Sequence, residues 1–312
     1  MLIEYINNKA KVLSQVNVLT NTYGFARSLM AFGLLITFLF NNTNILFSTD
    51  PDHYAHLSDV PLSKISFFLL LVHHLQIARI ITILILLIVV SGWRPRITGI
   101  LHWYVTFSFY ISSDYYDGGD QIAAILCLLL IPFCLFDKRK WAWIKLENST
   151  VSEYQKFVNI FLNVVYFVIR LQVCIIYLDA GIEKMKVNEW VDGTATYYWF
   201  TNAGFGAADW IKPLIVFLFS KPLIVVFFTW GTMIFEIILG MAIMMKRNNT
   251  NWKILLSMGI LFHFGIIVFH GLISFFFSMF AALILYLYPL NKYIPLKEKP
   301  FNQKKRINAV NI

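Results

Sequence analysis

The sequence contains eight apolar runs, each about long enough to cross a membrane as an α-helix. A transmembrane helix needs about 17 to 25 mostly apolar residues, because each residue advances about 1.5 Å through a hydrocarbon layer of about 30 Å. Two runs are short, so a count between six and nine is compatible with the sequence. We expect an all-α, polytopic integral membrane helix bundle with about eight spans, at residues 24–40, 75–91, 97–113, 121–136, 157–179, 222–245, 254–271 and 273–290.

The composition agrees with a membrane protein. Apolar residues make up 58% of the chain and charged residues 14%, whereas soluble domains carry about 25% charged residues. The three cysteines lie inside apolar runs, and the chain has no Walker or dinucleotide-binding glycine motif. These features exclude a disordered chain, a disulfide scaffold and a nucleic-acid partner, and leave the lipid bilayer as the environment.

The placement of the basic residues predicts the orientation of the bundle. With the N-terminus in the cytoplasm, eighteen of the 26 Lys and Arg residues fall in segments on the cytoplasmic side, and eleven of the 17 Asp and Glu residues fall outside. The positive-inside rule is thus satisfied loop by loop. We expect a multi-pass membrane protein with both termini cytoplasmic.

No linker rich in Gly, Ser or Pro divides the chain, which indicates a single membrane domain. We expect an interfacial N-terminal segment at 1–23, a transmembrane domain at 24–291 and a basic cytoplasmic tail at 292–312. The tail is typical of a stop signal after the last span, and contact with anionic lipid headgroups is the alternative.

Polar residues are densest in the outer segment 179–221, which begins where the fifth span is expected to end. Lys184 lies one turn beyond that end, between Gly181 and Trp190. A lysine beside apolar and aromatic surface loses hydration of its ammonium group and becomes a candidate base. The alternative is that Lys184 extends to the membrane surface without a chemical role.

A second outer segment ends in Gly118, Gly119 and Asp120, directly before the fourth span. Asp120 is placed to cap that helix, which is the simpler interpretation. As the alternative, its carboxylate acts as a charge partner or proton acceptor.

Ionisable residues inside apolar spans cost free energy, so each one indicates a site. Arg170 and Glu236 both project to mid-depth, where an interhelical ion pair would satisfy both. His263 lies deep in the seventh span. No spacing matches a zinc motif, and we expect no metal site.

One long motif resembles a known family. It runs from Arg170 through Tyr177, Gly181 and Lys184, then Trp190 and Gly193, in the pattern R-x(6)-Y-x-x-A-G-x-x-K followed by W-x-x-G. With Gly118-Gly119-Asp120, Glu236 and His263, it makes nearly the whole chain similar to the horizontally transferred transmembrane family, the membrane domain shared with vitamin K-dependent gamma-carboxylase. The size and the Tyr197-Tyr198-Trp199 sequence most resemble its sporulation-delaying protein B group.

This resemblance implies a role in toxin maturation. Members of the group are proteins of the bacterial cell membrane. They act with a small partner protein to convert the precursor of a secreted antimicrobial peptide toxin into its active form, a step of bacteriocin biosynthesis. In the carboxylase, the equivalent of Lys184 is the base, while the position of Asp120 is a histidine. The implied catalytic residues are Lys184 and Asp120, supported by Arg170, Tyr177, Gly181, Trp190, Glu236 and His263, on the extracytoplasmic face.

Two other functions remain open. One is a lipid- or quinone-dependent enzyme related to the carboxylase, and the other is a non-catalytic export, scaffold or immunity protein. The chain has no H-E-x-x-H or G-x-S-x-G motif, so it is not a recognisable protease. The sequence leaves open whether it is an enzyme, which cofactor it would use and which reaction it would catalyse.

Overall fold

The computed structural model describes residues 2–48, 61–145, 151–246 and 250–295. Within these ranges the chain is helical, and its β-structure is limited to an isolated antiparallel bridge between Trp93 and Trp141. Most of the expected basic tail, from residue 296 onward, lies outside the described residues.

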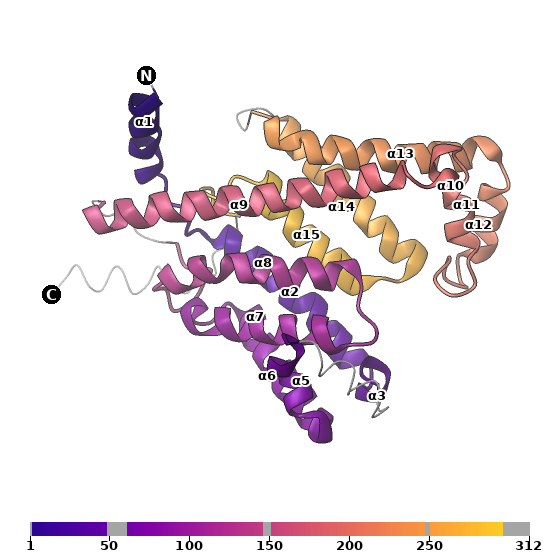
Figure 1. Ribbon diagram of the computed structural model, residues 1–312, viewed down its shortest axis with the longest axis horizontal. Helices are drawn as coiled ribbons and strands as arrows, with labels where there is room; N and C mark the ends of the chain where they lie inside the picture. Colours follow the sequence, from indigo (N-terminus) through magenta and orange to yellow (C-terminus); the bar gives the residue numbers. More distant parts are fainter. Residues whose placement is uncertain (1, 49–60, 146–150, 247–249, 296–312) are drawn as a thin grey trace, which may run out of the picture.

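Each of the eight expected spans corresponds to one long helix (Figure 1). In the described part of the chain, six of these helices are long and apolar enough to cross a membrane. Helix α15 is a shorter apolar helix, and α7 is not among the six. The prediction of an all-α membrane helix bundle is therefore confirmed. The helices are α2 (Asn21–Phe40), α6 (Leu75–Ser91), α7 (Pro95–Ser112), α8 (Gly118–Phe136), α9 (Glu153–Lys184), α13 (Pro222–Met241), α14 (Asn251–His270) and α15 (Ile273–Leu287).

Short helices connect and flank the long ones. They are α1 (Leu2–Ser14), α3 (Thr43–Leu46), η1 (Ser63–Ile65), α5 (Phe67–Leu70), η2 (Val72–His74), α10 (Asn188–Val191), α11 (Ala195–Thr201), α12 (Lys212–Phe219) and η3 (Ala242–Met244). Helices α10 to α12 gather beyond one end of α9, and α1 stands near its other end (Figure 1).

Helix α1 packs on α9 through side-chain amides. Asn159 donates to the carbonyl of Ser14 at 2.8 Å, and Asn163 donates to the carbonyl of Val16 at 2.8 Å. Helix α2 begins three residues before the expected start of the first span, because the Thr20 side chain accepts a hydrogen bond from the N–H of Thr22 and caps the helix there.

Helix α15 lies at the centre of the bundle, packed on α2, α8, α9 and α14. Residues 281–287 are all buried, as expected of a helix that is apolar on every side. The chain after α15 returns to the start of α2, where Thr20 donates to the carbonyl of Leu290 at 2.6 Å and Thr22 to that of Lys292 at 2.6 Å. The start of α2 and the end of α15 therefore lie at the same end of the bundle.

Helix α9 is the longest in the structure, with 32 residues. At about 1.5 Å per residue it is about 48 Å long, more than the hydrocarbon layer requires. It packs against α13, and the contact brings the candidate site together at the end of the bundle that carries α10 to α12 (Figure 1).

Candidate functional site

One face of α9 carries four of the predicted site residues. Arg170, Tyr177, Gly181 and Lys184 are spaced by seven, four and three residues, so they share one stripe of the helix. Lys184 was expected to lie one turn beyond the end of this helix. Helix α9 instead continues through Lys184, so this side chain projects from the last helical turn.

Lys184 forms an ion pair with Glu236 of α13. Its Nζ lies 2.7 Å from Oε2 of Glu236 and 3.1 Å from the carbonyl oxygen of Ala180. The two charged side chains are 22% and 11% exposed, so both are largely withdrawn from the surroundings. Lys184 therefore does more than extend towards the membrane surface.

Two glycines allow α9 and α13 to approach closely enough for this pair. A Cβ atom at Gly181 would lie 2.7 Å from the Ile237 side chain, and one at Gly240 would lie 2.6 Å from Leu178. Close approach through small residues is typical of helix pairs in membranes. Gly181 thus positions Lys184, which lies three residues further along the same helix.

Trp190, in the short helix α10 that follows α9, lies against the ion pair. The Lys184 ammonium lies 5.3 Å from the centroid of the Trp190 ring, within the range of a cation–π interaction. Trp190 is buried, and the turn after it is made by Gly193, whose φ of 84° favours glycine. The W-x-x-G part of the motif therefore folds an aromatic ring onto Lys184.

Tyr177 and His263 form a second polar pair beside the first. The Tyr177 hydroxyl lies 2.9 Å from Nε2 of His263 on α14, and Tyr177 is within electrostatic range of Glu236. His263 is 3% exposed, and its Nδ1 has no hydrogen-bond partner among the described residues. A buried polar atom without a partner costs about 1–3 kcal/mol, so His263 occupies this position against a cost in stability.

Arg170 does not pair with Glu236, and this prediction was wrong. The Arg170 guanidinium donates to the carbonyl oxygens of Tyr286, at 3.2 Å, and Ile243, at 3.5 Å. Arg170 and Lys184 are fourteen residues apart, about 21 Å along the helix, so one carboxylate cannot reach both. Glu236 lies opposite Lys184, whereas Arg170 lies at a different depth in the bundle, further back along α9.

Asp120 lies at the start of α8 and takes part in a reciprocal cap. Asp117 accepts from the N–H groups of Gly119, at 2.7 Å, and Asp120, at 3.1 Å, while Asp120 accepts from the N–H of Asp117 at 3.0 Å. Burial raises the pKa of the Asp117 carboxyl, against the lowering effect of these N–H groups. Capping, the simpler interpretation of Asp120, accounts for its position, and its catalytic role stays a prediction.

Phe275 and Tyr286, both on α15, were not anticipated from the sequence. A Cβ atom at Gly119 would lie 2.8 Å from the Cα of Phe275, whose ring centroid lies 5.7 Å from that of His263. Phe275 therefore stands between the α8 cap and the Tyr177–His263 pair. Tyr286 donates to the carbonyl of Gly240 at 2.6 Å. Only their place in a Phe-rich last span could have drawn attention to them.

The fold and the site define an all-α membrane protein with a largely buried Lys–Glu pair between two closely packed helices. Comparison with known proteins names the family. The chain is 37% identical to the sporulation-delaying protein SdpB of Bacillus subtilis (strain 168), over 93% of this chain and 88% of that protein. It therefore belongs to the family of SdpB.

A second relative in the same organism, the uncharacterized protein YitO, is 33% identical over the full length of both chains. No family model matches the sequence, and no solved structure matches it significantly. The broader resemblance to the membrane domain of the gamma-carboxylase stays a prediction.

Proposed function

We propose that this protein is a membrane component required for the maturation or activation of a secreted antimicrobial peptide toxin, with its site at the Lys184–Glu236 pair. The observation that carries the proposal is this ion pair, covered by Trp190 and flanked by Tyr177 and His263. It occurs in a chain whose relative is named a sporulation-delaying protein.

The arrangement supports proton transfer. A lysine that acts as a base must first lose its proton, and the Glu236 carboxylate at 2.7 Å is placed to receive it. The hydroxyl of Tyr177 and the imidazole of His263 offer further groups that can hold or pass a proton.

The proposal also includes orientation and partners. By charge distribution the site lies on the extracytoplasmic side, where a translocated precursor arrives, and both termini lie in the cytoplasm. The expected partners are the toxin precursor and a small protein of the same system. Asp120 would act at the edge of the site, across Phe275.

A second candidate is a non-catalytic scaffold, export or immunity protein. The Lys184–Glu236 pair itself favours it, because an ion pair between two helices can serve packing alone. The two candidates differ in what happens when the pair is kept but its chemistry is changed.

The test measures the mass and the killing activity of the secreted peptide from cells that carry each variant at checked membrane levels. We expect Lys184→Ala, Lys184→Arg and Glu236→Gln to abolish the mature peptide, because each removes the transferable proton or its acceptor. Lys186→Ala is the matched control, since Lys186 is exposed two residues away and pairs with Glu183. Asp120→Asn tests the second predicted catalytic residue.

A charge exchange separates the two candidates. In Lys184→Glu combined with Glu236→Lys, an ion pair can re-form, so protein levels should recover relative to the single variants. Under the proposal the mature peptide stays absent, because the base has moved to α13. Recovery of the mature peptide together with the protein level would instead support the scaffold.

A further inference from the structure

A large cavity lies away from the candidate site, at the end of the bundle where α14 begins and α15 ends. Its volume is about 1060 Å³, and its walls come from α1, α9, the start of α14 and the residues after α15. Thr250, at the start of α14, and Pro289, just after α15, both line it. Since spans end where the hydrocarbon layer ends, this cavity lies at the level of the membrane–water boundary.

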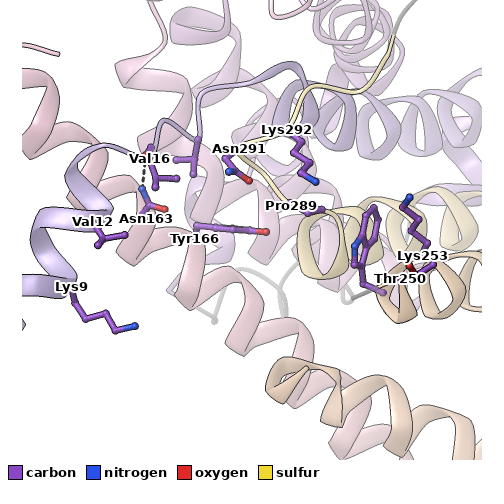
Figure 2. A pocket seen from close by; sticks show the side chains of 12 residues that line it. Lys9, Val12, Val16, Asn163, Tyr166, Thr250, Lys253, Pro289, Asn291 and Lys292 are labelled. Atoms are coloured by element: carbon purple, nitrogen blue, oxygen red, sulfur yellow. Dashed lines mark hydrogen bonds between the residues drawn. The ribbon is translucent and has the colours of Figure 1, made fainter. Parts of the chain in front are cut away.

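The floor of the cavity is aromatic and apolar. Tyr166, Trp252 and Pro289 are buried, and the Trp252 ring packs edge-on against Tyr288 with a centroid distance of 5.4 Å. The apolar side chains of Val12, in α1, and Val16 line another part of the cavity (Figure 2). Such a surface suits the glycerol and upper acyl carbons of a lipid.

The rim of the cavity is basic. Lys9, Lys253 and Lys292 are exposed, and they stand on different sides of the cavity in Figure 2. None of the three forms an ion pair with any residue in the described ranges. No acidic residue occurs among the twelve that line the cavity. Three ammonium groups without a carboxylate among the lining residues attract an anion.

We propose that this cavity binds the phosphate-bearing headgroup of an anionic phospholipid. The ammonium groups of the three lysines would hold the phosphate by charge attraction. Asn291 and Thr250 would make polar contacts to the headgroup, and the apolar floor would contact the adjoining carbons. The sequence beyond residue 295 is itself basic, with five Lys and Arg against Glu298. The same phosphate chemistry is shared by free inorganic phosphate, which the experiment separates.

The experiment uses the full chain in detergent and native mass spectrometry. Phosphatidylglycerol and phosphatidylcholine with the same acyl chains are titrated in parallel, and retained lipid is counted. We expect phosphatidylglycerol to be retained in preference to phosphatidylcholine. The triple variant Lys9→Gln, Lys253→Gln, Lys292→Gln should lose at least tenfold in phosphatidylglycerol affinity, since each lysine near an anionic membrane surface contributes about fivefold.

A matched triple variant, Lys64→Gln, Lys186→Gln, Lys221→Gln, removes the same charge from exposed lysines elsewhere and should keep wild-type retention. Unchanged phosphatidylcholine retention and melting temperature show that the tested variant is folded. Equal retention of both lipids by wild type, or equal loss in both triple variants, overturns the proposal. Displacement of phosphatidylglycerol by equimolar inorganic phosphate would assign the cavity to free phosphate and also overturn it.

Discussion

Buried charged side chains in this bundle contact polar groups from several segments of the chain. Asp137 and Arg139, in the turn after α8, are 1% and 3% exposed at their side chains and form an ion pair at 2.7 Å. Tyr23 of α2 donates to Asp137, and Arg139 donates to the carbonyls of Thr20 and Ile144. Burial lowers the pKa of Arg139, but its hydrogen bonds to Asp137 and the electrostatic influence of Tyr23 and Asp137 together raise it above its ordinary value. These contacts tie the α8–α9 connection to the start of α2.

Removing one member of this pair should destabilise the fold strongly. Asp137→Asn leaves the Arg139 charge buried without a carboxylate, at a cost of about 3–5 kcal/mol in the free energy of unfolding. Tyr23→Phe removes a single hydrogen bond and should cost about 1 kcal/mol. Thermal unfolding of the purified protein in detergent measures both. An Asp137→Asn variant that melts like wild type would show that the pair does not stabilise the bundle.

The cap of α8 gives a second test at a single residue. Asp117→Ala should lower stability by about 1 kcal/mol, because the N–H groups of Gly119 and Asp120 lose their acceptor, whereas Asn keeps a capping oxygen. Burial raises the pKa of Asp117, so the carboxyl keeps its proton more strongly in the folded state than in the unfolded state. The stability that this contributes is lost as the pH rises from about 4.

Asp117→Asn carries no such charge and should therefore gain relative to wild type as the pH rises. The test is to measure the melting temperatures of Asp117→Asn and of wild type across this pH range. A constant difference between the two proteins would argue against a raised pKa.

At the scale of the helices, the apolar runs predicted where helices form but not where each one ends. The run 157–179 lies within a helix that extends from Glu153 to Lys184, because Ser152 caps its start and no glycine or proline stops it at 179. Hydropathy measures how apolar a segment is, and it does not detect such caps. The extra turn carries Lys184 and decides which residue of α13 it meets.

The partner of Glu236 could not be predicted from the sequence either. Depth within a span is known from sequence only to about one turn, whereas an ion pair depends on the register of α9 against α13. That register is set by Gly181 and Gly240, whose close contacts exist only in the packed helices. The motif did single out Tyr177, Gly181 and Lys184 as site residues, and the structure places Trp190, Glu236 and His263 beside them.

This register should be sensitive to the size of residue 240. Gly240→Val puts a Cβ atom 2.6 Å from the Leu178 side chain, so α13 must move away from α9. We expect a loss of about 1–3 kcal/mol in stability, together with loss of the mature peptide if the proposed function holds. The control is Gly231→Ala on the same helix, where a Cβ atom would meet nothing within 4 Å. Equal stability of the two variants would show that the close approach is not required.

At the scale of the whole molecule, the structure joins the start of α2 to the end of α15 at one end of the bundle, by hydrogen bonds from Thr20 and Thr22. Helices α10 to α12 lie beyond the opposite end of α9 (Figure 1). The distribution of basic residues along the sequence predicts that the end with Thr20 and Leu290 faces the cytoplasm. Under the proposed function, the site must face the side of the membrane that a translocated precursor reaches.

Cysteine labelling in intact cells tests this orientation. The three native cysteines are buried, so a background reaction with a membrane-impermeant maleimide should be low. We expect Lys186→Cys and Ser220→Cys, at exposed positions beside the α10 to α12 end, to react in intact cells. Asn8→Cys and Lys140→Cys, at exposed positions near the other end, should react only after the membrane is permeabilised. The reverse pattern would place Lys184 on the cytoplasmic side and would contradict its action on a precursor that has already crossed the membrane.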